Sequence, residues 1–297
     1  MTRADSTLRK AETALTADSG ARSENRPDLL RAGPSRLTRV ERWIIRFVRA
    51  TFAPGLVDRW IRVLQRTIGS TWIHHCTKHL RHVYGLERLP PFDPEQSVIL
   101  VANHRSFFDL YVVIAELVRR GLPLRIVFPV RSTFFYTRFL GLFVNGVMSF
   151  FAMYPPIFRE RHQLALNVTS LGELSWLIRH RGVLAGMHPE GQRNKDGDPY
   201  TLLPAQRGVG KVIHETRVPV VPVFVNGLIN DLPRQIRSNF DRSGREIIVV
   251  FGKPVDFGGL LDERGSPRVY QAIADRTLEA VGELGVEERA IRERRSA

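Results

Sequence analysis

The chain beyond residue 84 alternates short apolar runs with amphipathic stretches, and this alternation constrains the fold more than any other feature. The apolar runs are rich in Val, Ile, Leu and Phe and have the length of buried strands, at 97–102, 125–130, 183–187, 220–225 and 247–251. Helical spacing dominates between them, notably at 109–120, 163–179 and 209–216. This order predicts an α/β fold, with a mostly parallel central sheet flanked by helices.

Composition divides the 297 residues into four predicted segments. Residues 1–36 are polar and mixed in charge, which indicates a disordered N-terminal tail. Residues 37–84 carry amphipathic helices, residues 85–260 form the α/β domain, and residues 261–297 form a C-terminal helix with a basic tail. No uninterrupted apolar run reaches the roughly 20 residues of a membrane-spanning helix. The nearest, 139–158, contains Asn145 and two prolines, and indicates a buried strand and loop.

Within residues 37–84, apolar residues recur at helical spacing and arginines occupy the positions between them. Trp43 and Phe47 mark the first stretch, and Trp60 marks the second, after a Pro-Gly break at 54–55. Aromatic apolar faces flanked by arginines are typical of helices that lie in a membrane interface. We therefore expect an amphipathic helical hairpin for membrane association. A hairpin packed on the domain is the alternative.

The formal net charge of +14 indicates an anionic partner, either nucleic acid, an acidic membrane surface, or a phosphorylated or carrier-bound substrate. No recognised nucleic-acid motif accompanies the basic residues, so we expect an anionic membrane surface and no nucleic acid. The single cysteine, Cys76, excludes an intrachain disulfide and a Cys-rich zinc site. His75, His79 and His82 could share a helix face, but no matching carboxylate or cysteine cluster completes a metal site. We expect a basic helix end near lipid head groups there.

A polar turn follows the apolar run at 97–102. His104 stands where this strand ends, and Asp109 stands where the next helix begins. Five residues along one helix are separated by about 140°, so the side chains meet only if His104 lies in the turn. A histidine base that is oriented by a carboxylate has this layout. A polar pair without a catalytic role is the alternative for this motif alone.

A second polar turn follows the run at 183–187 and reads Pro-Glu-Gly-Gln-Arg at 189–193. Its glycine allows a close approach of backbone to a ligand, and its arginine can bind a phosphate through two parallel hydrogen bonds. Together with the apolar Val-Pro-Val-Val-Pro-Val at 218–223, the two turns resemble the glycerophospholipid acyltransferase superfamily in motif type, order and spacing. That superfamily contains the 1-acylglycerol-3-phosphate acyltransferases, and the resemblance covers residues 85–256.

The resemblance implies that His104 takes a proton from a hydroxyl group of a lysophospholipid or glycerol-phosphate acceptor, while Asp109 orients the imidazole. The hydroxyl oxygen then attacks an acyl thioester donor, either acyl-CoA or acyl-carrier protein. No further cofactor and no metal is implied. Two departures lie beside the acceptor: His188 replaces the family's aromatic residue, and Gln192 replaces its usual threonine.

The resemblance also implies an acceptor-phosphate site made by Glu190, Gly191 and Arg193 of the third family block. A second-block arginine joins it, for which Arg159 and Arg161 both qualify, with Arg159 slightly favoured because it directly follows the apolar run. Pro222 matches the fourth block, a hydrophobic strand beside the acyl pocket, and the apolar stretch at 134–158 is a candidate wall for the acyl chain.

The predicted function is therefore a membrane-associated O-acyltransferase of phospholipid synthesis or remodelling, bound peripherally or monotopically at the cytoplasmic face of a membrane. Lysophosphatidate, another lysophospholipid, and a lipid-linked glycan or aminolipid all fit as acceptor. The competing interpretations are a His/Asp phosphoesterase or metal hydrolase, a basic nucleic-acid-binding protein, and a membrane protein that keeps the fold without the chemistry.

Overall fold

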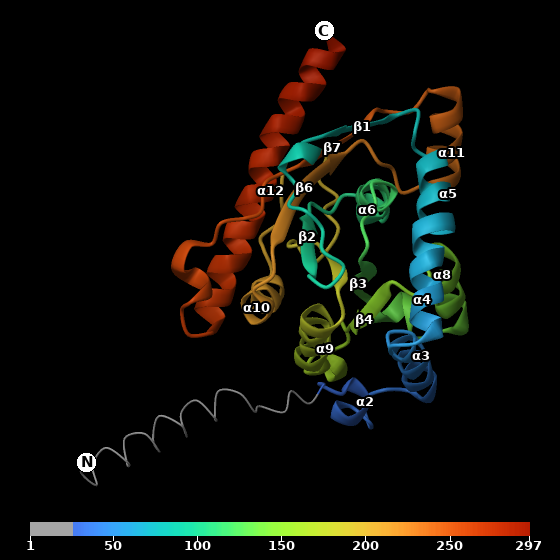
Figure 1. Cartoon of the computed structure of the whole chain (residues 1–297), viewed down its shortest axis with the longest axis vertical. Coiled ribbons are helices and arrows are strands. Elements are labelled where there is room, and N and C mark those ends of the chain that lie inside the picture. Colours follow the sequence, from blue (N-terminus) through green and yellow to red (C-terminus); the bar gives the residue numbers. More distant parts are fainter. Residues whose placement is uncertain (1–25) are drawn as a thin grey trace, which may run out of the picture.

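The computed structural model describes residues 26–297 and contains a seven-stranded sheet with helices on both faces (Figure 1). The sheet order is β1-β7-β6-β2-β5-β3-β4, and every neighbouring pair is parallel except β6 and β7. The strands are β1 (Arg81–Tyr84), β2 (Val98–Ala102), β3 (Arg125–Arg131), β4 (Met153–Ile157), β5 (Val183–Met187), β6 (Val220–Asn226) and β7 (Ile247–Phe251). The predicted α/β fold with a mostly parallel sheet is confirmed.

Four of the five predicted strands are fully buried, and the fifth, β3, is buried over its first four residues. Burial on both faces leaves a continuous apolar run in the sequence. Every residue of β2, β5, β6 and β7 is buried. The sequence did not reveal β1 and β4, which form the two edges of the sheet. The β1 sequence is polar and half-buried, and β4 contains two prolines, which edge strands tolerate because one side needs no ladder hydrogen bonds.

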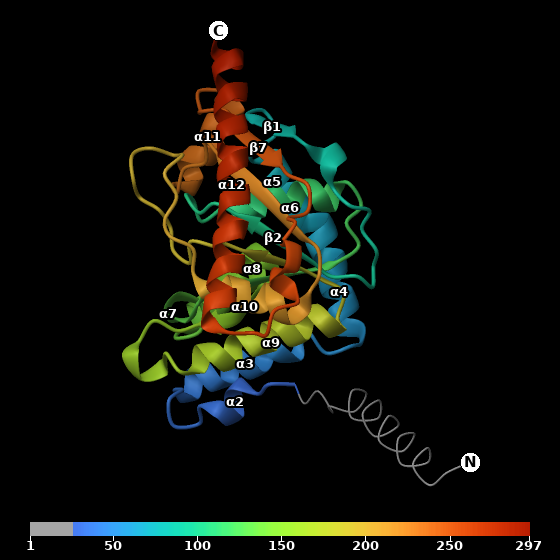
Figure 2. The ribbon, with the colours of Figure 1, turned by 90° about the vertical axis from the view of Figure 1, so that its left-hand side faces the viewer.

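Different sets of helices cover the two faces of the sheet. One face carries α6 (Asp109–Arg119) with α5 (Ser70–His75) packed on it. The other carries α9 (Leu166–His180), α10 (Arg207–Thr216) and the long α12 (Pro267–Ser296), which stand in the foreground of Figure 2. The remaining elements are α7 (Ser132–Phe135), α8 (Phe139–Ser149), α11 (Leu232–Asp241) and the short turns η2 (Leu86–Arg88), η3 (Arg161–Gln163) and η4 (Gly258–Leu261).

Part of the predicted N-terminal tail is folded. Residues 26–36 include the short helix α2 (Leu29–Ala32), which Asp28 caps. Leu29 is fully buried, and its N–H donates to Glu173 Oε1 over 2.7 Å. The prediction of disorder is therefore wrong for 26–36, because a single apolar anchor and a cap are enough to fix a segment that is polar on average. Residues 1–25 lie outside the described part of the chain.

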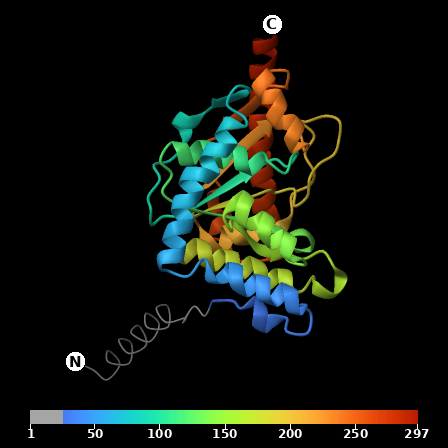
Figure 3. The ribbon, with the colours of Figure 1, turned by 90° about the vertical axis from the view of Figure 1, so that its right-hand side faces the viewer.

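The amphipathic segment forms helices but no hairpin. Helix α3 (Arg39–Ala50) begins with a capping box between Thr38 and Glu41. Helix α4 (Leu56–Leu64), the π-helical turn η1 (Gln65–Gly69) and α5 then run on as one rod, which lies at a large angle to α3 in Figure 3. The last four residues of the segment belong to strand β1, so the predicted helices end before 81.

A buried arginine fixes the turn between α3 and α4 to the sheet. Arg125 of β3 is fully buried, and its Nη1 donates to Thr51 O over 2.7 Å and to the Asp58 carboxylate. Its guanidinium also lies 4.0 Å from the centre of the Phe52 ring. Burial lowers the pKa of Arg125 to about 10, so the side chain remains charged at neutral pH. This ion pair anchors the N-terminal helices to the α/β domain.

Two further expectations need correction. The apolar stretch at 139–158 was expected to be strand and loop, yet it begins with helix α8, whose exposed apolar face the pattern did not distinguish from a buried run. The C-terminal helix is confirmed as α12, but its basic end is not a free tail. Arg292 pairs with the fully buried Glu288, and Arg295 pairs with Glu246, so the sheet edge holds the last turns.

The histidine cluster is dispersed in space. His75 ends α5, whereas His82 lies in β1 with its Nε2 3.2 Å from Glu246 Oε1. The shared helix face that a metal site would need does not form, because the helix ends before His79.

Candidate active site

The candidate site lies at the carboxyl end of β2, in the centre of the sheet. The side chain of Asn103, the first residue after β2, continues the ladder toward β6: its Nδ2 donates to Val225 O over 2.9 Å, and its Oδ1 accepts from Val225 N over 2.8 Å. The next residue is His104. The connection after β2 passes through α6 to β3, whereas the connection after its neighbour β5 passes through α10 on the opposite face to β6. Such a switch point is where open α/β sheets form their ligand crevice.

His104 and Asp109 meet as their spacing predicts. Asp109 is the first residue of α6 and is buried, and its Oδ2 lies 3.4 Å from His104 Nδ1. The same oxygen accepts the backbone N–H groups of Arg105 and Ser106 over 2.7 Å each. These amides fix the carboxylate beside the imidazole. Among residues 26–297 no hydrogen-bond partner engages His104 Nε2, which leaves this nitrogen available as a base.

The electrostatics favour a neutral imidazole. Burial, with a smaller effect from the Arg193 charge, lowers the pKa of His104 to about 4. Burial raises the pKa of Asp109 to about 7, opposed by His188 and by the two backbone amides. We therefore describe the contact as a hydrogen bond from a neutral Nδ1–H to Asp109 rather than as an ion pair. That tautomer presents the lone pair of Nε2 to a substrate.

Glu190 holds the loop between β2 and α6 that carries His104, which we call the catalytic loop. It is 1% exposed; its Oε1 accepts the backbone N–H of His104 over 2.7 Å, and its Oε2 accepts that of Leu203 over 2.8 Å. Both oxygens are thus used by the protein, and the side chain is too buried to bind an acceptor phosphate. The role implied by the family resemblance is wrong for Glu190: this carboxylate positions His104 instead.

Gly191 and the second-block arginines connect two loops. Gly191 has a φ of 64°, and a Cβ there would approach Gln206 to 2.6 Å, so the turn requires glycine. The Arg159 guanidinium donates to the Gly191 carbonyl, which brings the second block against the third. Arg161 is exposed in η3, and within the described chain no hydrogen bond or ion pair joins its side chain to the site. The preference for Arg159 over Arg161 agrees with this placement.

His188 stacks on His104. The two ring centroids are 3.8 Å apart, with 8° between the planes, and His188 Nδ1 lies 2.9 Å from Ala102 O. Burial, reinforced by the charge that His104 would carry, lowers the pKa of His188 to about 3. The residue that departs from the family pattern therefore provides a flat neutral platform, as an aromatic ring would.

The three side chains also satisfy the distance requirement of a metal site, since ligand atoms of His104, Asp109 and His188 lie within 4.8 Å of one another. The directions do not fit. A nitrogen lone pair lies in the plane of its ring, so the lone pairs of two nearly parallel stacked rings lie in separate planes and do not converge on one point, as a metal ion would need. We assign these contacts to hydrogen bonding and stacking.

Basic side chains surround a hollow beside the pair. It measures about 400 Å³ and is bordered by Arg105, Arg193, Lys195, Asn230 and Arg245. Arg193 was predicted, and its Nη1 donates to Asn230 Oδ1 over 2.7 Å. The other four were missed. A usable signal was present for Asn230, which follows an apolar strand in the same way as the two recognised turns.

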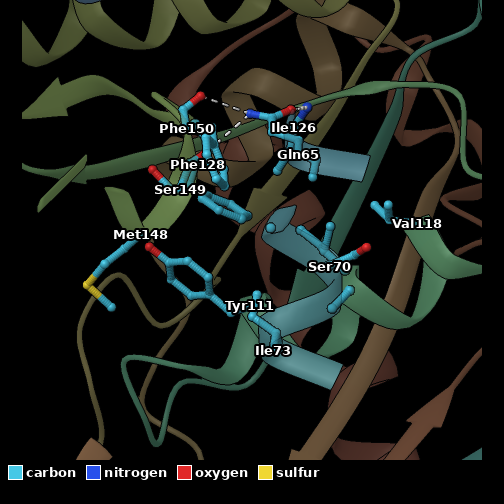
Figure 4. A pocket seen from close by; sticks show the side chains of 14 residues that line it. Gln65, Ser70, Ile73, Tyr111, Val118, Ile126, Phe128, Met148, Ser149 and Phe150 are labelled. Carbon is cyan, nitrogen blue, oxygen red and sulfur yellow. Dashed lines mark hydrogen bonds between the residues drawn. The ribbon is translucent and has the colours of Figure 1, made fainter. Parts of the chain in front are cut away.

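Pro222 lies away from these groups. It is in the middle of β6, and its ring faces Gly252 and Leu284 on the side covered by α12. The apolar cavity in Figure 4 lies instead beside α6, between η1, α5 and the end of α8, and Pro222 does not border it. Its predicted placement beside an acyl pocket therefore stays a prediction, and this cavity does not support it. The predicted wall at 134–158 does reach the cavity, through Met148, Ser149, Phe150 and Ala152.

Comparison with known proteins agrees with this geometry. Residues 81–226 match the family described as Acyltransferase, a range that contains the His104, Glu190 and Pro222 blocks. The chain belongs to the glycerophospholipid acyltransferase superfamily. The human 1-acyl-sn-glycerol-3-phosphate acyltransferase alpha is 25% identical over 154 residues, which cover 50% of this chain and 48% of the relative. The human beta form is 28% identical over 153 residues, 49% of each chain.

A relative from Chlamydomonas reinhardtii, also named 1-acyl-sn-glycerol-3-phosphate acyltransferase, is 26% identical over 202 residues, 65% of this chain and 53% of the relative. The match thus spans about half the length of these curated relatives. The crystal structure of the 1-acyl-sn-glycerophosphate acyltransferase PlsC from Thermotoga maritima has a TM-score of 0.49 at 20% identity, covering 84% of this chain and 90% of that one.

The substitution Glu190→Gln tests whether the two hydrogen bonds that Glu190 accepts hold His104 in position. An amide has only one acceptor oxygen, so either the His104 or the Leu203 N–H loses its partner. We expect kcat for acyl transfer to fall about 10- to 100-fold, with little change in the KM for the acceptor, because His104 is displaced. Glu279→Gln, at an exposed position on α12, is the matched control. A higher acceptor KM at unchanged kcat would instead restore the phosphate-binding role.

Because His188 contacts His104 by ring stacking, we expect the rate to depend on the presence of a flat ring at position 188. His188→Phe keeps a flat ring against His104, and we expect kcat within about threefold of wild type. His188→Ala removes the stack and should lower kcat about tenfold, in line with the energy of one aromatic contact. If His188 were a metal ligand or a second base, phenylalanine would be as damaging as alanine.

Proposed function

We propose that this protein is a membrane-associated O-acyltransferase that transfers a fatty acyl group from an acyl thioester to a hydroxyl of a lysophospholipid or glycerol-phosphate acceptor. The observation that carries the proposal is the His104–Asp109 pair, with Nδ1 directed to the buried carboxylate and Nε2 without a hydrogen-bond partner in the part of the chain that the structure describes. The names of the relatives support a 1-acylglycerol-3-phosphate acceptor.

In this mechanism, His104 Nε2 takes the proton of the acceptor hydroxyl as its oxygen attacks the thioester carbonyl carbon. Asp109 holds the ring and stabilises the imidazolium that forms. The tetrahedral intermediate then collapses: the carbon–sulfur bond breaks, and the thiolate takes the proton back from the imidazolium. The products are an ester and a free thiol, and no covalent acyl-enzyme, cofactor or metal takes part.

The acceptor phosphate would bind beside this pair. Arg193 borders the hollow at the end of β2, and its charge acts on His104. Arg159 lies against Gly191 on the neighbouring loop. A phosphate held between these guanidinium groups would place a glycerol hydroxyl near Nε2. The apolar cavity of Figure 4 measures about 30 Å³, which is too small for a fatty acyl chain. Ring contacts of Phe107 with Tyr111 and of Tyr111 with Phe128 connect the loop after β2 to its lining.

An exposed apolar face supports membrane association. Helices α3, α4 and α8 bury one side on the domain and leave large apolar side chains in solvent on the other, including Trp43, Phe47, Leu56, Trp60, Phe139, Leu140 and Phe143, each at least 41% exposed. Trp43 of α3 and Phe139 of α8 touch, with ring centroids 5.5 Å apart, so the face is continuous across the two helices. Contiguous exposed apolar patches mark interaction surfaces. The exposed residues Arg46 and Arg138 are sequence neighbours of Phe47 and Phe139 in this patch.

Across residues 26–297, none of the helices combines the length and apolar character that a bilayer crossing requires. A face that lies in the head-group region, with arginines toward anionic lipids, is consistent with the proposed site of action at the cytoplasmic surface of a membrane.

The catalytic proposal is tested with purified protein in detergent, a lysolipid panel and a labelled acyl thioester. His104→Ala should abolish detectable transfer, and Asp109→Asn should lower kcat about 10²–10⁴-fold, because the wrong tautomer of His104 becomes available. His214→Ala, on α10, is the control. Transfer by folded His104→Ala at a rate near that of wild type would refute the assignment. Loss of wild-type turnover in chelator would favour a metal hydrolase.

Membrane binding is tested by flotation with anionic vesicles. Trp60→Glu and Phe143→Glu should each lower the fraction bound by about tenfold or more, since each removes an apolar side chain from the interface and adds a negative charge. Val286→Glu, equally exposed but on α12, should float like wild type. Equal flotation of all three variants would show that this face does not bind lipid.

A further inference from the structure

The loop between β6 and α11, which we call the β6 loop, contacts the catalytic loop. It comprises residues 227–231. Ser106 Oγ donates to Ile229 O over 3.3 Å, and the backbone N–H of Phe107 donates to Asn230 Oδ1 over 3.0 Å. Since β2 lies between β5 and β6 in the sheet, the catalytic loop is supported from the β6 side as well as from the β5 side.

The Asn230 side chain binds donors from two different loops through one oxygen. Besides the Phe107 N–H, Arg193 Nη1 donates to Asn230 Oδ1 over 2.7 Å. An amide oxygen has two lone pairs, so it can accept both hydrogen bonds at once. Both partners are donors without an acceptor function, so the oxygen of the amide must face them. Asn230 thereby joins the catalytic loop to the loop after β5.

Arg193 depends on this contact for its position. Its side chain is exposed, and among residues 26–297 Asn230 is its single hydrogen-bond acceptor. A long exposed side chain adopts many rotamers unless a contact selects one of them. The Arg193 charge contributes, after burial, to the lowered pKa of His104, so the selected position lies near the imidazole. The Asn230 amide thus determines where the guanidinium stands relative to His104.

The Asn230 amide is neutral, and this affects the charge that Arg193 presents. A carboxylate at position 230 could accept the same two hydrogen bonds, but it would form an ion pair with the guanidinium. That ion pair would weaken the attraction between Arg193 and any further anionic group. An amide oxygen orients the guanidinium and leaves its positive charge available to a phosphate.

The β6 loop has supports other than the Asn230 side chain. Asp231 caps α11 by accepting the Arg234 N–H over 3.1 Å, and the Ile229 N–H donates to Gln235 Oε1 over 3.0 Å. Gln235 is buried, whereas Asn230 is exposed. A substitution at position 230 should therefore leave the loop and the fold intact, and its effects should report on the two hydrogen bonds.

We propose that Asn230 is a positioning residue for acyl transfer, which fixes the Arg193 guanidinium relative to His104 by binding it to the catalytic loop. The inference rests on the proposed function, in which Arg193 binds the acceptor phosphate and His104 takes the proton of the acceptor hydroxyl. Both groups then act on one acceptor molecule. Their separation decides whether the hydroxyl of a phosphate-bound acceptor reaches Nε2.

A double-mutant cycle on the full-length protein tests whether Asn230 acts through Arg193. The KM for 1-acylglycerol 3-phosphate is measured with a saturating acyl thioester. Arg193→Ala and Asn230→Ala should each raise this KM by about tenfold or more, and the double variant should match Arg193→Ala. The kcat of Asn230→Ala should stay within about threefold of wild type, because Glu190 and Asp109 still hold the catalytic loop.

The matched control is Gln96→Ala, which removes an exposed side-chain amide just before β2, at the other end of that strand. This variant should keep the wild-type KM. A wild-type KM for Asn230→Ala refutes the proposal, and so do effects of the two substitutions that multiply in the double variant.

The conservative variant Asn230→Asp separates positioning from charge. It keeps an acceptor oxygen for both donors, so hydrogen–deuterium exchange of the Phe107 amide should stay as slow as in wild type. Asn230→Ala should speed this exchange by about tenfold. The acceptor KM should nevertheless rise about tenfold in Asn230→Asp, because the carboxylate neutralises Arg193. A merely structural role would change exchange and KM together.

The exchange measurement and calorimetry with 1-acylglycerol 3-phosphate need no turnover, and this separates the inference from the proposed function. If wild type transfers to no acceptor, the proposed function is overturned. The role of Asn230 then stands if Asn230→Ala speeds exchange at Phe107 and weakens acceptor binding no further in the absence of the Arg193 side chain. If wild type transfers and Asn230→Ala changes neither exchange nor KM, the function stands and this inference is overturned.

Discussion

The buried carboxylate of Glu190 joins the two loops on which the site depends. It lies after β5, and it accepts one backbone amide from the loop after β2 and another from the segment before α10. A buried carboxylate is costly unless both oxygens are satisfied, and here the two amides satisfy them. The turn after β2 is thereby held in place, and the positions of His104, of its partner Asp109 and of the stacked His188 all follow from it.

Two further polar side chains restrain the same loop. Asp109 fixes the same loop from its helical side by accepting the amides of Arg105 and Ser106, and Asn103 fixes it to β6. Thus three polar side chains restrain a short loop from three directions. A general base, which is the role that we propose for His104, needs this restraint, because a displacement of about 1 Å can cost a factor of about 100 in rate.

Apolar and basic side chains occupy different surfaces around the site. Apolar side chains of α3, α4 and α8 form an exposed face, and the apolar cavity lies between that layer and the sheet. Basic side chains gather instead along α11 and the loops after β5 and β6. Lipid chains and phosphates would approach His104 over different surfaces. The buried ion pair of Arg125 with Asp58 holds the apolar layer to the sheet that carries the catalytic loop.

The sequence by itself determined the central strands, the helices between them and the pairing of His104 with Asp109. Buried parallel strands leave apolar runs, and the spacing of the pair allows only one local arrangement. Tertiary structure decided what periodicity does not encode: the edge strands β1 and β4, the angle between α3 and α4, and the burial of Glu190. It also decided the basic hollow beside the pair, because Arg105, Lys195 and Arg245 are far apart in sequence and border it together only when the strand ends converge.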